Sequence, residues 1–274
     1  MISIVQDVTP ETLLAASYEH FVAYVLHCGR APGGVIYDTP ELAWGLTGVP
    51  SSWMNSVVRT RLAPDSKIDR IIEGVVARAR ERSVPLGWFI TPGTQPEDLG
   101  ARLEAHGLRY DEEEPGMSVD LRTLPDRVEI PDGVRVVEVL DLATLELWAR
   151  TWGESYDAPE AKWRSRYEFR AAQGLGPTVP YRPYLAFWGD QPVATSELFL
   201  GAGVAAIVWV GTVPAARRLG IGAAVTLAPL LDARRMGYRI GALTASNLGY
   251  RVYQQLGFRE MCRLPVYLWS PEEH

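Results

Sequence analysis

Residues 205–223 constrain the fold of this chain more than any other segment. An apolar, β-branched run over residues 205–213 stops at Pro214, and a short basic turn follows that carries Gly220 and Gly222. The next residues are rich in Ala, Leu and Val, which favours a helix. The first N–H groups of a helix have no intrahelical acceptor, and the helix dipole places about half a positive charge at that end. Strand, glycine-spaced turn and helix therefore predict a main-chain cradle for phosphate.

The glycine spacing excludes two common nucleotide-binding motifs. A dinucleotide fingerprint requires G-x-G-x-x-G, and a triphosphate loop requires G-x-x-x-x-G-K-S/T. This chain instead has R-x-x-G-x-G, formed by Arg217, Gly220 and Gly222, shortly after a strand that ends in Val-Pro. The arrangement resembles the coenzyme A pyrophosphate loop of the GNAT (GCN5-related N-acetyltransferase) superfamily. In such a loop, glycine removes the Cβ atoms that would hold a diphosphate away from the main-chain N–H groups.

Residues 245–259 are similar to a second signature of the same superfamily, a helix with a tyrosine shortly before Leu-Gly-Phe. Here that tyrosine is Tyr253. Ser246 or Asn247 is expected to cap the helix, and Gly257 is expected to end it. Its apolar face is predicted from the helical spacing of Leu248, Val252 and Leu256. The two signatures together cover residues 205–260.

The two halves of the chain resemble each other at an offset of 150 residues. Gly107-Leu108-Arg109 recurs as Gly257-Phe258-Arg259, and four further pairs match: Pro64 with Pro214, Gly87 with Gly237, Trp88 with Tyr238, and Ile90 with Ile240. Each half is expected to run strand, helix, strand, helix, glycine turn, strand. A linker rich in Pro and charge lies at residues 124–133, so we expect domains over residues 1–125 and 126–274.

Only the second half retains the cofactor motif. At the same offset, Gly220, Gly222 and Tyr253 stand opposite Arg70, Ile72 and Leu103. The first half is therefore expected to be a degenerate GNAT-like domain without cofactor binding, which supports the second half and walls off part of the acceptor site.

The remaining patterns of the second half predict a mixed, twisted sheet flanked by helices. The expected strands are residues 134–140, 184–188, 192–200, 205–213, 240–244, 258–263 and 265–269. Helices are expected after a cap at Asp141, near Pro159 and over residues 219–236, where Pro229 is expected to bend the helix. The predicted fold class is α/β (α+β), with two tandem GNAT-like domains.

The resemblance implies acetyl-CoA as co-substrate and names the residues that would hold it. The pyrophosphate is expected on the N–H groups of residues 218–223, and the pantetheine arm along the end of the strand before Pro214. The expected cofactor contacts are Gly211, Thr212, Val213, Arg217, Arg218, Leu219, Gly220, Ile221, Gly222, Ala223 and Asn247. Arg217 lies along the diphosphate or is a solvated surface residue, and Asn247 binds pantetheine or only caps a helix. The N–H of Gly211 or of its neighbour is the expected oxyanion donor.

Acetyl transfer also needs a proton for the leaving thiolate and a group that takes the amine's proton. Tyr253 is the candidate general acid, because a phenol with a pKa of about 10 is protonated at neutral pH. Glu197, on the strand beside the cofactor strand, is the candidate base; the alternative is a surface carboxylate. Glu154 and Asp157 are further candidates for binding a cationic acceptor. The nearby aromatic residues either line the acceptor pocket or pack in the core: Trp148, Trp152, Tyr156, Trp163 and Tyr167.

Composition excludes other classes. The net charge is −6 and no basic block stands out, so nucleic acid is not expected as a partner. Cys28 and Cys262 lie far apart, which predicts neither a disulfide framework nor a zinc site, and the histidines form no ligand group. We expect no metal, no signal peptide and a cytoplasmic protein. A charge-free stretch over residues 198–216 contains three glycines and a proline, and is better explained by two buried strands than by a membrane span.

The expected function is an N-acetyltransferase that acts on an amine of a small molecule or peptide, by direct attack in a ternary complex. One alternative is a coenzyme A-binding sensor or partner module without turnover. Another is a transferase with a different acyl donor, or an aminoacyl-transferring relative built from paired GNAT domains. The acceptor amine and the oligomeric state are not predicted.

Overall fold

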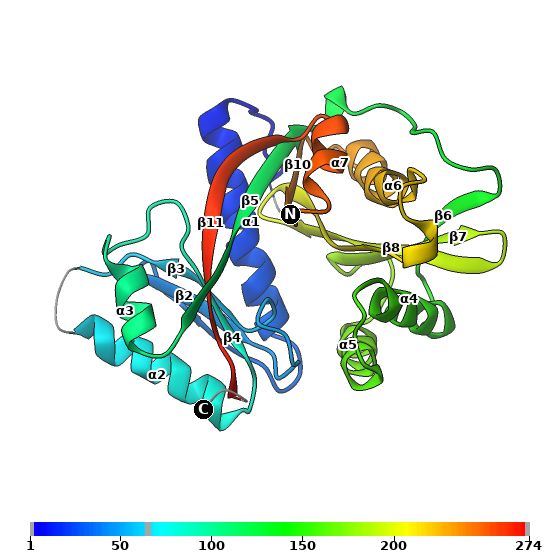
Figure 1. Ribbon diagram of the computed structural model, residues 1–274. Coiled ribbons are helices and arrows are strands. Elements are labelled where there is room, and N and C mark those ends of the chain that lie inside the picture. Colours follow the sequence, from blue (N-terminus) through cyan, green and yellow to red (C-terminus); the bar gives the residue numbers. More distant parts are fainter. Residues whose placement is uncertain (1–2, 64–66, 272–274) are drawn as a thin grey trace. The chain divides into compact units, whose positions relative to one another are not determined.

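The computed structural model describes residues 3–63 and 67–271 and divides the chain into two compact units, each made of two segments. Unit 1 consists of Met1–His20 and Gly116–Met261. Unit 2 consists of Phe21–Pro115 and Cys262–His274. Figure 1 shows their helices and strands. Pro64, one of the matched positions of the internal repeat, lies outside the described residues.

The elements follow one another in an order that fits the repeat. In the first half they are α1 (Pro10–Gly29), β1 (Val35–Asp38), β2 (Leu42–Leu46), β3 (Ser56–Thr60), α2 (Lys67–Glu81), β4 (Leu86–Phe89), α3 (Leu99–Ala105) and β5 (Arg109–Asp120). In the second half they are β6 (Val134–Glu138), α4 (Leu142–Ser155), α5 (Glu160–Gln173), β7 (Tyr181–Trp188), β8 (Gln191–Gly201), β9 (Val204–Thr212), α6 (Ile221–Arg235), β10 (Ile240–Thr244), α7 (Tyr250–Gln255) and β11 (Arg259–Trp269). The predicted succession of strand, helix, strand, helix and strand is confirmed as β3-α2-β4-α3-β5 and as β9-α6-β10-α7-β11.

Unit 1 contains a mixed sheet with the strand order β5-β10-β9-β8-β7-β6. The pairs are antiparallel except for β9 and β10, which run parallel. In unit 2 the order is β1-β2-β3-β4-β11, and only β3 and β4 are parallel. Each parallel pair is joined by a helix, α6 in unit 1 and α2 in unit 2, as a parallel connection requires.

The last strand of each half pairs with the other half. The end of β5, residues 116–120, lies antiparallel to β10 in unit 1, where Asp120 stands opposite Ile240. The end of β11 lies antiparallel to β4 in unit 2, where Trp269 stands opposite Leu86. Each sheet is therefore completed by a strand from the other half of the sequence. The predicted domain boundary at residues 125/126 marks where the sequence begins to repeat, whereas the two units are defined by their compactness. The boundary therefore stays a prediction.

Helices cover both faces of the unit 1 sheet. Ala205 and Ile207 of β9 pack in one cluster with Ile221 and Val225 of α6 and with residues of α7. The alternate residues of β9 and β10 face the first part of α1, and the alternate residues of β7 face α4. Figure 1 shows α6 and α7 on the side of β6–β9 opposite α4 and α5. This layering places the ends of α4, α6 and α7 at the end of β9.

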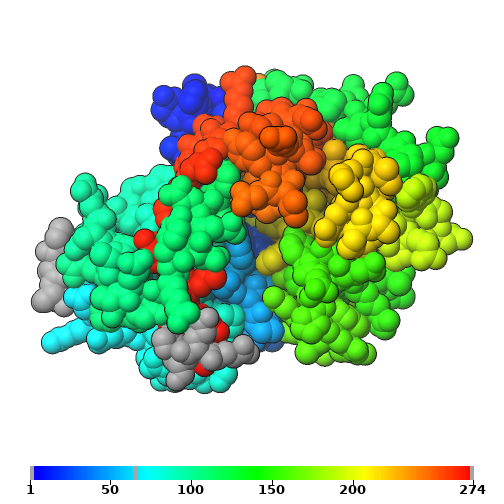
Figure 2. Space-filling view, in the orientation of Figure 1, coloured from blue at the N-terminus to red at the C-terminus, as the bar shows by residue number. Residues whose placement is uncertain are grey.

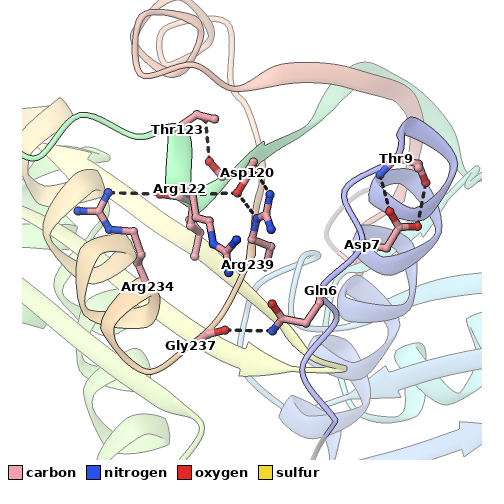
Figure 3. Close-up of polar contacts among 10 residues, drawn as sticks. Gln6, Asp7, Thr9, Asp120, Arg122, Thr123, Arg234, Gly237 and Arg239 are labelled. Atoms are coloured by element: carbon pink, nitrogen blue, oxygen red, sulfur yellow. Dashed lines mark hydrogen bonds and ion pairs between the residues drawn. The ribbon is translucent and has the colours of Figure 1, made fainter.

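Polar contacts fix the chain that leaves β5 (Figure 3). Asp120 accepts two hydrogen bonds from Arg239, at 2.5 and 2.6 Å, and the guanidinium beside it lowers the pKa of that carboxyl. Arg234 of α6 contacts the carbonyls of Leu121 and Leu124 and the carboxylate of Asp126. The linker that follows β5 is therefore held against α6.

Several local predictions are confirmed. Asp141 caps α4 by accepting from the N–H of Thr144 at 2.8 Å, and α5 starts directly after Pro159. Gly107 and Gly257 both have positive φ, +85° and +100°, after α3 and α7. Residues 240–244 form β10 as predicted. Among the described residues, no helix is long and apolar enough to span a membrane.

Other predictions are wrong. The two strands expected on either side of Leu264 are one strand, β11, in which the Pro265 carbonyl accepts from the N–H of Ile90. The helix expected near Ser246 starts at Tyr250, and Leu248 is 85 % exposed instead of buried. Ser246 accepts from the N–H of Gly249 in a turn before the helix. The helix α2 starts at Lys67, a few residues earlier than the repeat predicts from α6, so Arg70 lies inside α2 and is no structural counterpart of Gly220.

His20 predicts how stability depends on pH. It is 3 % exposed in unit 1, with Nε2 at 3.1 Å from the carbonyl of Phe199. Burial lowers the pKa of His20 to about 4, against the opposing hydrogen bond to Phe199. Between the unfolded value of about 6.5 and this folded value, only the unfolded chain binds the proton. His20 therefore does not lower the free energy of unfolding above pH 6.5. Below pH 6.5 the free energy of unfolding falls by about 1.4 kcal/mol for each pH unit, to a total loss of about 3 kcal/mol near pH 4.

We expect His20→Gln, which keeps a hydrogen-bond donor but does not titrate, to flatten this pH dependence. Urea unfolding of both proteins at pH 7, 5.5 and 4.5 measures the effect, because the carboxylates contribute equally to both. Parallel declines in the free energy of unfolding would show that His20 is not responsible.

Candidate active site

The strands β9 and β10 separate after a short parallel ladder. Within the described residues this ladder joins Ala205 with Gly241 and Ala206 with Ala242. Beyond it, β9 continues to Thr212 while paired with β8 on its other side. The edge of β9 from residue 207 to residue 212, which we call the open edge, can therefore take an extended ligand in the manner of an added strand.

A bulge interrupts β9 just before its end. Glu197 of β8 stands opposite Val208, but Thr195 stands opposite Gly211, so β9 carries one extra residue. Trp209 has φ +57°, which is uncommon for a residue with a side chain. Its carbonyl accepts from the Thr195 hydroxyl at 3.2 Å. Bulges of this kind redirect the main-chain and side-chain groups that follow them.

The ladder with β8 decides which groups of β9 face the open edge. The N–H of Val213 donates to the carbonyl of Val193 at 3.0 Å. Hydrogen-bonded pairs alternate along an antiparallel ladder, so Gly211 also bonds to β8. The N–H groups of Val210 and Thr212 then point the other way. Of the expected oxyanion donors, the neighbours of Gly211 have the required direction and Gly211 does not.

The two carbonyls on the open edge are held by side chains. The Tyr156 hydroxyl donates to the carbonyl of Val210 at 2.8 Å, and Arg217 Nε donates to the carbonyl of Thr212 at 3.0 Å. Arg217 also donates to the carbonyl of Ser155 at 2.9 Å, so it joins the end of α4 to the end of β9. A Cβ on Gly211 would lie 2.7 Å from Ser155 Cβ, which explains why glycine is needed there. In this structure Arg217 therefore has a structural role, and its contact with a diphosphate stays a prediction.

The predicted phosphate cradle lies at the start of α6. Gly220 is the N-cap residue, with φ +78° and no side-chain cap hydrogen bond, so the cap position itself leaves the helix N–H groups available. A Cβ on Gly220 would lie 2.4 Å from the carbonyl of Glu129, whereas one on Gly222 would lie at an ordinary 3.4 Å from Thr212 Oγ1. Gly220 is thus required by the protein itself, while Gly222 is not. Arg218 and Leu219 are exposed, and the buried Ile221 offers only its main chain.

Tyr253 lies on α7, on the same face of the sheet as α6, and is 7 % exposed. Its ring is close to Gly249, where a Cβ would lie 2.7 Å from Tyr253 Cε2. Burial raises the pKa of Tyr253 well above 10, and the phenol of Tyr156 adds to the effect. Tyr253 is therefore protonated throughout the neutral range. Asn247 is exposed in the loop between β10 and α7.

Glu197 is not on the surface. It is fully buried, and its two carboxylate oxygens accept from Arg170 Nε and Nη2 at 2.6 Å each. Burial raises the pKa of Glu197, while Arg170 and Arg166 oppose that rise. To accept a proton from an amine, this carboxylate would have to leave its ion pair. The alternative of a surface carboxylate is wrong.

Sequence reasoning missed the two buried arginines of α5. Arg170 stacks on Tyr181 at 3.8 Å from the ring centroid, and Arg166 lies between the rings of Trp152 and Trp209, at 3.9 and 3.7 Å. Neither arginine was predicted, because α5 reads as a polar surface helix. The available signal was Glu197, since a carboxylate in an apolar strand needs a buried cation.

The end of α4, the start of α6 and the helix α7 lie on one side of unit 1. Figure 2 shows that the segments of α7 (orange), of the loop before α6 (yellow) and of α4–α5 (green) reach the same face, and that the surface between them is recessed. Among the described residues, no group of three or more His, Cys, Asp or Glu is arranged to hold a metal ion. The arrangement suits a chain-like ligand with a phosphate end.

Comparison of the sequence with models of protein families gives no match, and neither does comparison with curated proteins. Solved structures do match. A GCN5-related N-acetyltransferase from Kribbella flavida is 19 % identical, with a TM-score of 0.69 over 92 % of this chain and 94 % of the other. One from Sphaerobacter thermophilus is 15 % identical, with a TM-score of 0.61 over 97 % and 95 %.

A tandem GNAT protein from the clavulanic acid biosynthesis pathway is 13 % identical, with a TM-score of 0.55 over 98 % of both chains. The predicted fold class is confirmed, because these matches extend over nearly the whole chain. This protein therefore has the fold of the GNAT N-acetyltransferases, in an arrangement similar to that of a tandem GNAT protein.

Proposed function

We propose that this protein transfers an acetyl group from acetyl-CoA to an amine of a small molecule or peptide. One observation carries the proposal: the open edge of β9 and the start of α6, a strand edge and a helix N-terminus, are joined by a single loop and pack in the same hydrophobic cluster as Tyr253. The helix N-terminus provides N–H groups for a diphosphate. The open edge provides amides for pantetheine, and the fold supports acyl transfer.

In the proposed reaction the amine attacks the thioester carbonyl directly. The N–H of Val210 or Thr212 donates to the oxygen that becomes negative, and such a donor is typically worth about 10²–10³ in rate. As the carbon–sulfur bond breaks, the thiolate takes the proton of the Tyr253 hydroxyl. The nitrogen loses its extra proton to solvent or to a carboxylate, and Tyr253 regains one from solvent. The products are the amide and free coenzyme A.

The base stays the least defined part of the proposal. Glu197 acts as the base only if its ion pair with Arg170 opens. If the amine arrives neutral, solvent takes the proton instead. The first half is proposed to lack cofactor binding. Leu103, which stands where the repeat places Tyr253, is fully buried in the unit 2 core and has no proton to give.

A thiol-release assay tests the function. The full-length protein is incubated with acetyl-CoA and a panel of small amines, antibiotics and peptide N-termini, and then with longer acyl-CoAs. Calorimetry with coenzyme A is run in parallel. Binding with amine-dependent thiol release supports the enzyme, whereas binding without release from any donor supports the sensor alternative. Absence of binding contradicts both.

Gly222→Ala is expected to separate coenzyme binding from stability. The added methyl group fits the protein, and alanine in a helix is favoured over glycine by about 1 kcal/mol, so the melting temperature should hold or rise. The same methyl group would stand among the N–H groups that grip the diphosphate, and we expect the affinity for coenzyme A to fall at least tenfold. Calorimetry and thermal melting measure the two effects.

The matched control is Gly74→Ala in α2, where an added Cβ meets only the end of the Arg78 side chain, at 3.6 Å. It should give the same gain in stability and leave coenzyme affinity unchanged. Equal affinities of the two variants would place the diphosphate elsewhere.

A further inference from the structure

Tyr156 is the residue whose role is not explained by coenzyme binding. It ends α4, its side chain is half exposed, and its ring packs against Trp152 at 5.3 Å between centroids. Its hydroxyl reaches the open edge of β9 and donates to the carbonyl of Val210 at 2.8 Å. The Tyr156 phenol therefore stands on the strand that would hold the thioester.

This hydrogen bond fixes which way the hydroxyl acts. A phenol has one proton to donate and also accepts through its oxygen lone pairs. In Tyr156 the proton is directed to a main-chain carbonyl, so towards a ligand the oxygen acts as an acceptor. Tyr253 is the opposite case, because burial keeps its proton in place for donation.

The position of this oxygen relative to the transfer site follows from the strand. In an extended residue the N–H and the C=O point to the same edge, so the Tyr156 oxygen lies beside the N–H of Val210. That N–H is one of the two proposed oxyanion donors. A nucleophile that attacks a carbonyl held by Val210 thus approaches within reach of Tyr156.

The packing around Tyr156 is built to keep it there. Gly211 allows the last turn of α4 to approach β9, since a Cβ would lie 3.0 Å from Tyr156 Cε2. Arg217 ties the preceding residue, Ser155, to the same strand end. The phenol is therefore held on β9 by its contacts with Val210 and Gly211, and the residue before it is held by Arg217.

We propose that Tyr156 binds the acceptor amine: its oxygen accepts a hydrogen bond from the amine N–H and orients the nitrogen lone pair towards the thioester carbon. This inference rests on the proposed acetyl transfer and adds an acceptor-binding residue to it. It also defines the acceptor chemically, as an amine with an N–H to donate, which means a primary or a secondary amine. A quaternary ammonium has no N–H in any protonation state and is excluded as a ligand of Tyr156.

The test compares Tyr156→Phe with the wild type, using the best amine from the thiol-release screen. Loss of one hydrogen bond to the reacting amine should lower kcat/KM for the amine roughly tenfold to a hundredfold. The KM for acetyl-CoA should stay within twofold, because the coenzyme cradle is untouched. Tyr184→Phe is the matched control: it also loses one hydroxyl hydrogen bond, to Asp232 at 2.7 Å, on β7 away from the open edge.

The outcomes are distinguishable. If Tyr156 only holds β9 in position, Tyr156→Phe should weaken acetyl-CoA binding together with turnover. That result overturns the inference but not the proposed function. An amine kcat/KM equal to that of Tyr184→Phe overturns it as well. An inactive wild type overturns the proposed function, and this inference with it. Should Tyr156→Phe melt well below Tyr184→Phe, competition by the quaternary ammonium analogue of the substrate amine in the wild type decides, and inhibition with an affinity equal to the substrate's counts against Tyr156.

Discussion

Replacing Tyr253 by phenylalanine is expected to lower kcat by about 10²–10⁴-fold while leaving the KM for acetyl-CoA unchanged. The leaving thiolate, with a pKa near 8.5 by comparison with cysteine, is a weaker base than tyrosinate, so the phenolic proton moves to sulfur only as the carbon–sulfur bond breaks, and the step is completed when Tyr253 regains a proton from solvent. Tyr253 is 7 % exposed and burial raises its pKa, so the phenol keeps its proton throughout the neutral range. Phenylalanine fills the same space without a proton to give.

Steady-state kinetics with saturating acetyl-CoA measure this effect. Tyr250→Phe is the control on the same helix, because its hydroxyl donates to the exposed Glu260 at 2.8 Å and has no part in the proposed transfer. The pH–rate profile of the wild type adds a second readout: activity should rise with pH as the amine loses its proton, with no fall assigned to Tyr253 below pH 10. Unchanged turnover in Tyr253→Phe would mean that solvent protonates the thiolate.

Replacing Glu197 by alanine is expected to destabilise the protein by about 3–5 kcal/mol, or roughly 6–20 °C in Tm. The physical reason is that Arg170 is 1 % exposed and would be left as a buried cation without its bidentate partner. Neutral contacts of Arg170, such as those with the ring face of Tyr181 and the amide of Gln173, do not replace a carboxylate. Thermal and urea unfolding measure the loss.

Two further variants locate the cause of that loss. Glu168→Ala removes an exposed carboxylate from α5 and should change stability by less than about 0.5 kcal/mol. Replacing Glu197 by leucine together with Arg170 by methionine removes both charges, and it should recover much of the stability, as for other buried ion pairs. If the Glu197→Ala protein were as stable as the wild type, the ion pair would not hold Glu197 in place, and Glu197 could act as the base.

The parts of the fold that local sequence determines could be predicted well. The cap at Asp141 and the glycine ends of α3 and α7 depend on residues within one turn of each other. The start of α6 at Gly220 could be predicted for the same reason, because strand, turn and helix follow one another directly. Leu248 shows the limit of periodicity: it fits the helical spacing, yet the helix begins two residues after it.

What the sequence by itself determined is the order of the elements, the repeat, the GNAT fold and the strand, glycine turn and helix at Gly220, since all of these depend on short-range spacing. The tertiary structure alone decided that β5 and β11 complete each other's sheets, that Glu197 pairs with Arg170, and that Tyr156 reaches Val210. These contacts join residues far apart in the chain. Their geometry depends on strand register and on a single bulge at Trp209, and one residue of register reverses which groups of β9 face the open edge.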